Sequence, residues 1–350
     1  MNFITLTACA RHIAKSADML VFYDDSRTFG GHEIMFLEGL KGILADRNTN
    51  CAVIISAFNA ALKERLEAMY ESSPRLSLYE IRHSSSRFAS VMTFISPFRL
   101  IRLFRFLKEI KPRRAIIIQG NIEFSSLGLV AAKLAGIHTV SYIPMTVAHA
   151  SSKNIFTAIC KYPFNEILFR MADEFITISE TERDALKRRR ENVPVHVVFN
   201  GVAVKKSAGT ISEHAFRAKY GIPDNKRIIA VIGRIQFAQK GHDILMRAAD
   251  RYHNLLEGCH FLIVGSGSDE NRLKEFVSAR RIDSLFTFIP WMDDLKPVYR
   301  ISDAILMPSR YEGVPLTAIE SIMESVPVIL SDRIVSLNGL IPQDLFFPLE

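Results

Sequence analysis

Two carboxylates flank the start of a predicted helix in the stretch MPSRYEGVPLTAIESIMESVP, residues 307–327. The pattern predicts a buried strand that ends at Met307, a short loop, and a helix with Pro315 in its first turn. First-turn N–H groups have no intrahelical acceptor and attract anions. Glu312 lies in the loop and Glu320 about one and a half turns into the helix. This arrangement suits a ligand with phosphate and hydroxyl groups, such as a nucleotide sugar; the alternative is two exposed surface charges.

Two cations lie in GRIQFAQKGHDIL, which joins a predicted strand end to a helix start. Arg234 and Lys240 are separated by a predicted flexible loop and flank the start of the helix at Gly241. Both side chains bind diphosphates, Arg through a planar fork and Lys as a point charge. They would also stabilise the negative charge that develops as a nucleoside diphosphate leaves. The alternative is a pair of exposed loop cations.

Glycines follow two other predicted strands at points where a helix begins. Gly30 and Gly31 follow the strand at 19–25, and Gly265 and Gly267 lie in GSGS after the apolar run CHFLIV. Glycine at such a junction lets a ligand approach the backbone closely, although a tight turn alone also explains it. The full G-x-G-x-x-G fingerprint is absent, which argues against a nicotinamide or flavin site.

Histidines and paired acids give weaker indications. His149 is placed at a strand-to-helix junction deep in the first half of the chain, where it could bond a sugar hydroxyl. His32, beside the glycine pair, is a competitor, and an ordinary structural role is open for both. No Asp-x-Asp follows an apolar strand, and the pair Asp24-Asp25 is typical of turns and helix N-caps. We therefore expect no essential divalent metal, with the two loop cations in its place.

These residues must be positioned by strands that alternate with helices in two successive series. Such alternation predicts an α/β fold with parallel sheets that are covered on both faces. Small and polar residues at 203–212 separate the series, so we predict domains at 1–202 and 203–350. The first strand is expected at Met19, and residues 1–18 lack the features of a signal peptide and are expected to be a loose leader. Two tandem Rossmann-like domains would bind ligands beyond the carboxyl ends of their strands, in the cleft between them.

Composition limits the class of protein and its partners. The hydrophobic fraction of 48% and charged fraction of 23% are typical of a soluble globular protein, and no apolar run is long enough to span a bilayer. The four cysteines form no C-x-x-C pair, which favours a reducing compartment and argues against a zinc site. The net charge of +7 favours an acidic partner. Nucleic acid is disfavoured because the chain lacks an aromatic-basic motif.

The segment SPFRLIRLFRFLKEIKPRR, residues 96–114, predicts a helix in which basic residues are interspersed with apolar ones. A basic amphipathic helix can lie on an anionic membrane surface. The apolar positions also suit packing on a sheet, with the cationic side in water. Both interpretations stay open. The Ser- and Arg-rich residues 82–96 before this segment predict a loop.

The tandem architecture and the motifs GRIQFAQKG, FLIVGSGS and EGVPLTAIE resemble the family 4 glycosyltransferases, retaining enzymes of the GT-B fold. FGGHE resembles their N-terminal Gly-Gly loop, FITISE and FNGV their interdomain stretch, and VPVILS the strand after their signature helix. The resemblance covers most of residues 19–332. It implies that Glu312 contacts the donor hexose, that Glu320 contacts the ribose hydroxyls, and that Arg234 and Lys240 hold the diphosphate.

The resemblance also implies a set of donor-binding residues along the backbone. The complete set is Gly30, Gly31, Gly265, Gly267, Gly313, Val314, Leu316 and Thr317, with His149 as an approximate match to a catalytic histidine. The family transfers sugar with retention of anomeric configuration, usually without a bound metal. A front-face displacement, in which the leaving phosphate helps to deprotonate the acceptor, is the mechanism that the resemblance implies.

The chain departs from the family pattern at two places that bear on the expectation. Ser325 and Val326 stand in ESVPV where the family usually has glycine before the strand. The family normally continues past Glu350 with further helices, so we expect a truncated C-terminus.

The expected function is a retaining glycosyltransferase that moves a hexose or N-acetylhexosamine from a UDP- or GDP-sugar to a glycan or lipid-linked hydroxyl. It would need no cofactor and would work in the cytoplasm, with possible peripheral contact at the anionic inner face of the plasma membrane. The alternatives are a sugar phosphorylase on the same fold and a non-catalytic or truncated nucleotide-sugar-binding protein.

Overall fold

The computed structural model describes residues 4–6, 19–27, 29–46, 48–85, 88–146, 155–202, 211–338 and 340–349. The chain divides into two compact units, residues 1–200 and 201–350, which are described separately below. This division lies two residues before the boundary predicted from the sequence. No helix within the described ranges is both long and apolar enough to cross a bilayer.

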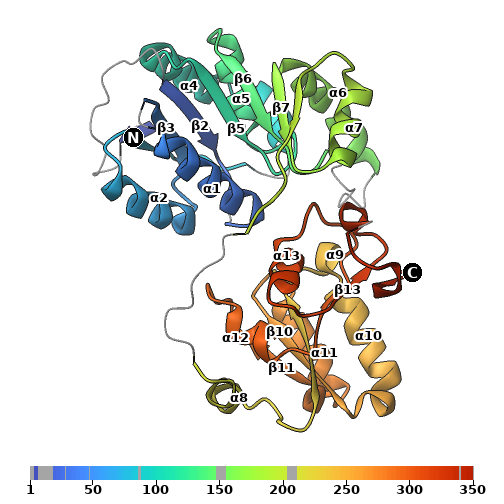
Figure 1. Ribbon diagram of the computed structural model, residues 1–350. Coiled ribbons are helices and arrows are strands. Elements are labelled where there is room, and N and C mark those ends of the chain that lie inside the picture. The colour runs from blue at the N-terminus through green and yellow to red at the C-terminus, as the bar shows by residue number, and fades with distance from the viewer. Residues whose placement is uncertain are drawn as a thin grey trace. The chain divides into compact units, whose positions relative to one another are not determined.

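The N-terminal unit contains an eight-stranded sheet with helices packed on it (Figure 1). Its strands are β1 (Ile4–Leu6), β2 (Met19–Asp24), β3 (Asn50–Ser56), β4 (Leu76–Ile81), β5 (Arg114–Ile118), β6 (His138–Tyr142), β7 (Glu174–Thr177) and β8 (Val195–Val197). Its helices are α1 (Gly31–Ala45), α2 (Ala60–Ser72), α3 (Ala89–Ile95), α4 (Pro97–Ile110), α5 (Ser126–Leu134), α6 (Ile155–Met171) and α7 (Glu180–Arg189). The strand order is β1-β4-β3-β2-β5-β6-β7-β8.

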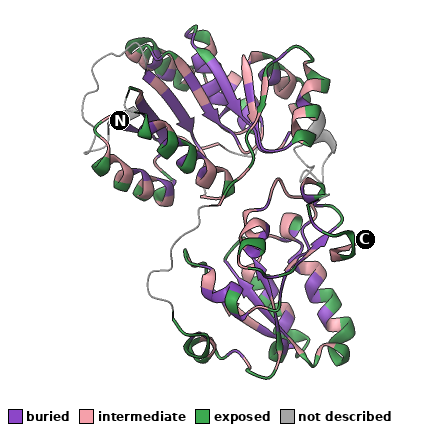
Figure 2. Cartoon of the chain, in the orientation of Figure 1, coloured by how far each residue is buried: buried purple, intermediate pink, exposed green. Residues whose placement is uncertain are grey.

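Every neighbouring pair from β4 to β8 is parallel, and β1 pairs antiparallel with β4. The chain runs to one side of β2 through β3 and β4, and to the other side through β5 to β8. Right-handed crossovers therefore place α1 and α2 on one face and α5 to α7 on the other. Because both faces are covered, the central strands are apolar and buried along their length, as Figure 2 shows for this sheet. The predicted parallel α/β fold is confirmed.

Three local predictions for this unit were wrong or incomplete. The predicted loop at 82–96 contains helix α3, whose small polar residues are buried; the Thr93 hydroxyl lies 2.8 Å from that of Ser126 on α5. The sequence FNEILFRMAD predicts a helix from residue 164, but helix α6 begins at Ile155 and contains Pro163. Strand β1 precedes the strand expected first, and its three residues are too few to give a sequence pattern.

The C-terminal unit contains a six-stranded parallel sheet in the order β11-β10-β9-β12-β13-β14. Its strands are β9 (Arg227–Ile232), β10 (Cys259–Val264), β11 (Phe286–Ile289), β12 (Ala304–Met307), β13 (Val328–Ser331) and β14 (Phe346–Phe347). Its helices are α8 (Glu213–Tyr220), α9 (Phe237–Lys240), α10 (His242–Tyr252), α11 (Glu270–Ala279), α12 (Lys296–Ile301) and α13 (Leu316–Met323). Short 3-10 turns are η1 (His253–Leu256), η2 (Asp283–Leu285), η3 (Val335–Leu337) and η4 (Gln343–Leu345).

The order of the C-terminal sheet reverses between two neighbouring strands. From β9 the chain moves outward through β10 and β11, then returns to place β12 on the other side of β9 and continues to β13. In open parallel sheets, such a reversal leaves a crevice outside the carboxyl ends of the two strands, and ligands bind there. Arg234 lies in the loop after β9 and Glu312 in the loop after β12. Lys240 and Glu320 lie on the helices that follow these loops, α9 and α13.

Candidate active site in the C-terminal unit

Three glycines allow the loops at the carboxyl ends of β9, β10 and β12 to pack closely against one another. An added Cβ would lie 2.0 Å from the carbonyl oxygen of Gly233 at Gly265, and 2.2 Å from that of Ile235 at Gly267. At Gly241 it would lie 1.9 Å from the carbonyl oxygen of Pro308. These contacts explain part of the glycine pattern, since side chains would force the loops apart. Close packing of these loops is therefore enough to explain why residues 265 and 267 are glycine, without contact to a ligand.

Lys240 and Glu312, two of the residues predicted to form the site, meet at the carboxyl ends of these strands. The Lys240 ammonium lies 2.6 Å from Oε1 of Glu312, and both side chains are mostly buried. The hydroxyl of Ser309 donates to the same carboxylate at 2.8 Å. The lysine side chain also passes over Gly233, where an added Cβ would lie 3.7 Å from Nζ. A cation and a carboxylate from two different loops are thus held side by side.

Arg234 is exposed and follows β9 by two residues. Burial raises the pKa of the nearby Tyr311 hydroxyl, the Glu312 carboxylate raises it further, and the Arg234 guanidinium lowers it. The structure brings together Lys240 and Glu312, two of the predicted site residues. That Arg234 joins them at a diphosphate remains a prediction.

A fork of two ion-paired hydrogen bonds fixes the loop that carries Glu312. The guanidinium of Arg310 donates to both carboxylate oxygens of Asp243 at 2.7 Å, and its backbone N–H donates to the carbonyl of Gln239 at 2.8 Å. The pKa of Asp243 is lowered, because the arginine outweighs the effect of burial. The interval between Arg234 and Lys240, predicted to be flexible, contains the single turn α9. Both partners of this fork were missed, although each adjoins a motif singled out in the sequence.

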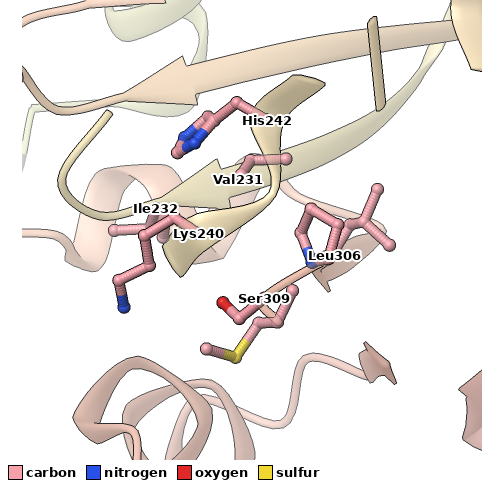
Figure 3. Close-up of a pocket in the computed structure, with 8 residues that line it drawn as sticks. Val231, Ile232, Lys240, His242, Leu306 and Ser309 are labelled. Atoms are coloured by element: carbon pink, nitrogen blue, oxygen red, sulfur yellow. The ribbon is translucent and has the colours of Figure 1, made fainter. Parts of the chain in front are cut away.

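A small hollow lies between the ends of β9 and β12, directly at the reversal of strand order (Figure 3). It encloses about 200 Å³, including space open to solvent. Its lining is Val231, Ile232, Lys240, His242, Leu306, Met307, Pro308 and Ser309. His242 is only 1% exposed, and neither ring nitrogen has a hydrogen-bond partner in the described structure. Burial, and then the nearby lysine cation, lower the pKa of His242 to about 4, so that its imidazole is neutral at pH 7.

Glu320 lies on the second turn of α13 and is bonded within the unit. The hydroxyl of Tyr299, on α12, donates to its carboxylate at 2.7 Å. Burial, and then the charge of Glu320, raise the pKa of Tyr299, which therefore stays a donor. This hydrogen bond fixes one oxygen of the carboxylate. Pro315, expected in the first turn, is the N-cap residue of α13 instead.

The other predicted backbone contacts lie in the loop before α13 and in its first turn. The carbonyl of Gly313 accepts from Ser336, and the hydroxyl of Thr317 lies 3.9 Å from the sulfur of Met307. Val314 precedes the N-cap and Leu316 begins the helix. Their predicted contacts with a donor phosphate or sugar remain predictions.

In the N-terminal unit, the glycine pair opens helix α1. Gly30 is its N-cap, and its N–H donates to Glu33 at 2.8 Å in a capping box. Gly31 is unlike Gly241, Gly265 and Gly267, since an added Cβ there would meet no atom within 4 Å. His149 lies outside the described residues. Thr146, the last described residue before it, donates its backbone N–H to Glu182 at 2.7 Å.

Asp24 and Asp25, expected to be turn or N-cap residues, are both buried. Asp24 accepts from the backbone N–H of Ser26 at 2.8 Å, as turn residues do, whereas the N-cap of the following helix is Gly30. Asp24 ends β2, and single ligand atoms from Asp24, His32 and Glu33 lie within 4.8 Å of one another. Burial, and then the Glu33 carboxylate, raise the pKa of Asp24 to about 7. Such a cluster can hold either a shared proton or a metal ion. That the protein needs no metal remains a prediction.

Comparison with known proteins identifies relatives of the part of the chain that contains these residues. Residues 212–341 match the family described as Glycosyl transferases group 1. The chain is 28% identical over 256 residues to a UDP-Gal:alpha-D-GlcNAc-diphosphoundecaprenol alpha-1,3-galactosyltransferase of Escherichia coli, covering 69% of this chain and 62% of the relative. An uncharacterized glycosyltransferase of Haemophilus influenzae is 25% identical over 65% of this chain and 59% of its own length. The chain thus spans about three fifths of the length of these relatives.

Solved structures share the fold at low sequence identity. Anabaena Alr3699/HepE in complex with UDP-glucose superposes with a TM-score of 0.70 and 14% identity, covering 94% of this chain and 85% of that protein. WaaG, a glycosyltransferase involved in lipopolysaccharide biosynthesis, has a TM-score of 0.67 and 15% identity, with 92% and 83% covered. Residues 212–341 are therefore a group 1 glycosyl transferase domain, and the chain has the two-sheet GT-B fold.

Proposed function

We propose that the protein is a retaining glycosyltransferase that moves a hexose or N-acetylhexosamine from a nucleotide sugar to a hydroxyl of a glycan or lipid-linked acceptor. One observation carries the proposal. At the reversal of strand order in the C-terminal sheet, the ammonium of Lys240 and the carboxylate of Glu312 pair beside a hollow that Lys240 lines, and Arg234 follows the same strand, β9. Such a crevice is where parallel α/β sheets bind nucleotides.

The roles follow from the charges. Arg234 and Lys240 bind the diphosphate, which gains negative charge as the bond between the anomeric carbon and the phosphate oxygen breaks. Glu312 accepts a hydrogen bond from a hydroxyl of the donor sugar, and its pairing with Lys240 holds both groups in place before the donor arrives. The acceptor oxygen forms the new bond to the anomeric carbon, and its proton goes to the departing phosphate.

Glu320 is assigned to the ribose hydroxyls. Tyr299 donates to one oxygen of its carboxylate and so orients the group that would accept hydrogen bonds from the ribose. A uridine donor is favoured over a guanosine donor, since one relative is named for UDP-Gal and one structural neighbour was solved with UDP-glucose. The lipid-linked acceptor rests on the name of the same relative. For such an acceptor, we also propose peripheral contact with the inner face of an anionic membrane.

The first test is nucleotide binding measured by thermal shift with UDP, GDP, ADP and TDP. Ligand at one hundred times its Kd stabilises a folded domain by about 2.7 kcal/mol. We expect one nucleotide to give a shift, without added magnesium, and Arg234→Ala to abolish it. Arg227→Ala is the matched control, because this exposed arginine is the first residue of β9 and lies at the amino-terminal end of the strand, away from the proposed site. Equal losses in both variants would remove the assignment of Arg234.

The second test separates transfer from binding alone. An active transferase releases free nucleoside diphosphate when donor sugar and an extract of acceptor lipids are mixed with it. Glu312→Gln should abolish this release but keep nucleotide binding, because its role is on the sugar. Saturable donor binding without release would identify a non-catalytic nucleotide-sugar-binding protein. A requirement for inorganic phosphate would identify a phosphorylase.

A further inference from the structure

The corner between α3 and α4 exposes apolar side chains that the fold does not need. Helix α3 ends at Ile95 and α4 begins at Pro97, so that Ile95 and Phe98 lie on either side of the junction. Phe98 is 82% exposed and Ile95 61%, and Ile101, one turn along α4, is 45% exposed. A solvent-exposed phenylalanine and two isoleucines at one corner form an apolar surface, which we call the α3–α4 corner.

Helix α4 already buries a different face against the sheet. Leu103 and Leu107 are fully or almost fully buried in the core of the N-terminal unit. Further apolar residues of α4 pack partly against the same core: Leu100, Phe104, Phe106 and Ile110. Packing on the sheet therefore accounts for these residues and leaves Phe98 and Ile101 on the opposite side. Packing on the sheet, one of the two interpretations of the sequence, thus applies to one face of α4. The membrane interpretation concerns the opposite face.

Cations surround the apolar corner. Arg99, Arg102, Arg105 and Lys108 are exposed along α4, and Lys111 follows it, whereas Glu109 is its one acidic residue. Positions three and four residues apart lie on one side of a helix, so Arg102 and Arg105 continue the stripe that begins at Phe98. Long basic side chains beside aromatic and aliphatic ones are typical of helices that lie in a lipid headgroup layer. The charge selects an anionic surface.

We propose that the α3–α4 corner docks on an anionic lipid bilayer, with Ile95, Phe98 and Ile101 among the acyl chains and the arginines at the headgroups. A second copy of the chain is disfavoured as the occupant, because two such corners would bring like charges together. The inference rests on the proposed function, since a lipid-linked acceptor would be reached at this surface.

Co-sedimentation with vesicles tests the proposal. The protein should bind vesicles that contain phosphatidylglycerol and bind vesicles of phosphatidylcholine alone at least about tenfold more weakly, because each cation near an anionic surface contributes about 1 kcal/mol. By the same figure, Arg102→Ala and Arg105→Ala should each weaken binding about fivefold. Added salt should weaken it further by screening.

Phe98→Asp should reduce binding at least about tenfold, because it removes the inserted ring and adds a negative charge that the anionic headgroups repel. Leu255→Asp is the matched control, since Leu255 is 81% exposed in the other unit, on η1. Both variants should retain the nucleotide-dependent thermal shift, so failure to bind vesicles is distinguishable from failure of the proposed function. Equal binding to both vesicle types, equal loss in both aspartate variants, or self-association that Phe98→Asp abolishes would each overturn the proposal.

Discussion

Gly265→Ala should destabilise the C-terminal unit far more than a surface substitution does. Gly265 follows β10 with a φ of +145°, which side-chain-bearing residues rarely adopt. An added Cβ would also lie 2.0 Å from the carbonyl oxygen and 3.0 Å from the carbonyl carbon of Gly233, and both atoms are backbone. The clash cannot be relieved by a rotamer change. The loops after β9 and β10 must separate.

The expected size follows from two contributions. A residue held in a sparsely populated backbone region costs about 1–3 kcal/mol. Overpacking that shifts backbone costs typically about 1–3 kcal/mol more. The total of about 2–6 kcal/mol is a large part of the roughly 5–15 kcal/mol that stabilises a domain. The same displacement would move the loop that carries Arg234 and should weaken nucleotide binding.

Urea unfolding followed by tryptophan fluorescence measures this effect in one unit alone. Trp291 is the single tryptophan of the chain and lies half-exposed between β11 and α12. Gly258→Ala is the matched control at the other end of β10, because Gly258 directly precedes this strand and its Cβ would meet no atom within 4 Å. The control should change the unfolding free energy by less than about 0.5 kcal/mol. Equal effects of the two variants would refute the reasoning about interlocked loops.

Ser325→Gly should stabilise the C-terminal unit by about 1 kcal/mol, measured by urea unfolding, because Ser325 follows α13 with a φ of +60°. Gly31→Ala should leave thermal stability unchanged, because its Cβ meets no atom within 4 Å; a lower affinity for nucleotide sugar in calorimetry would support its predicted role. Asp24 has a pKa of about 7 in the folded protein and near 3.8 when unfolded, so its contribution to the unfolding free energy is present below pH 4 and is lost as the pH rises through 7. Urea unfolding followed by circular dichroism should show that Asp24→Asn removes this loss. His242, with a pKa of about 4, acts in the opposite sense: Trp291 fluorescence should show stability lost as pH falls from 6.5 to 4, and His242→Leu should remove that loss.

The parallel α/β architecture was predictable because strand and helix patterns alternate strongly along the chain. The conformation of short segments was harder to predict. Helix α3 was missed because its buried positions are Ala, Ser and Thr, which resemble loop composition. Turn α9 was missed because four residues give no helical period. In both cases tertiary packing decides the conformation, and a local pattern does not report it.

Within the candidate site, loop position and charge were enough to predict that Lys240 and Glu312 lie at one site, although their direct ion pair was not predicted. The fork between Arg310 and Asp243 was not predictable, since the two residues are far apart in sequence and each is typical of a surface charge. The burial of Asp24 was missed for a related reason. An acid at the end of a strand has the composition of a turn, and only the packing of α1 over it places it in the interior.

A crystal structure of the protein with a bound nucleoside diphosphate tests the central claim most directly. The account predicts phosphate oxygens within about 2.7–3.2 Å of the guanidinium of Arg234 and the ammonium of Lys240, at the carboxyl ends of β9 and β12. It also predicts a ribose hydroxyl within hydrogen-bond distance of the carboxylate of Glu320. A diphosphate bound away from both cations, with the ribose away from α13, would contradict it.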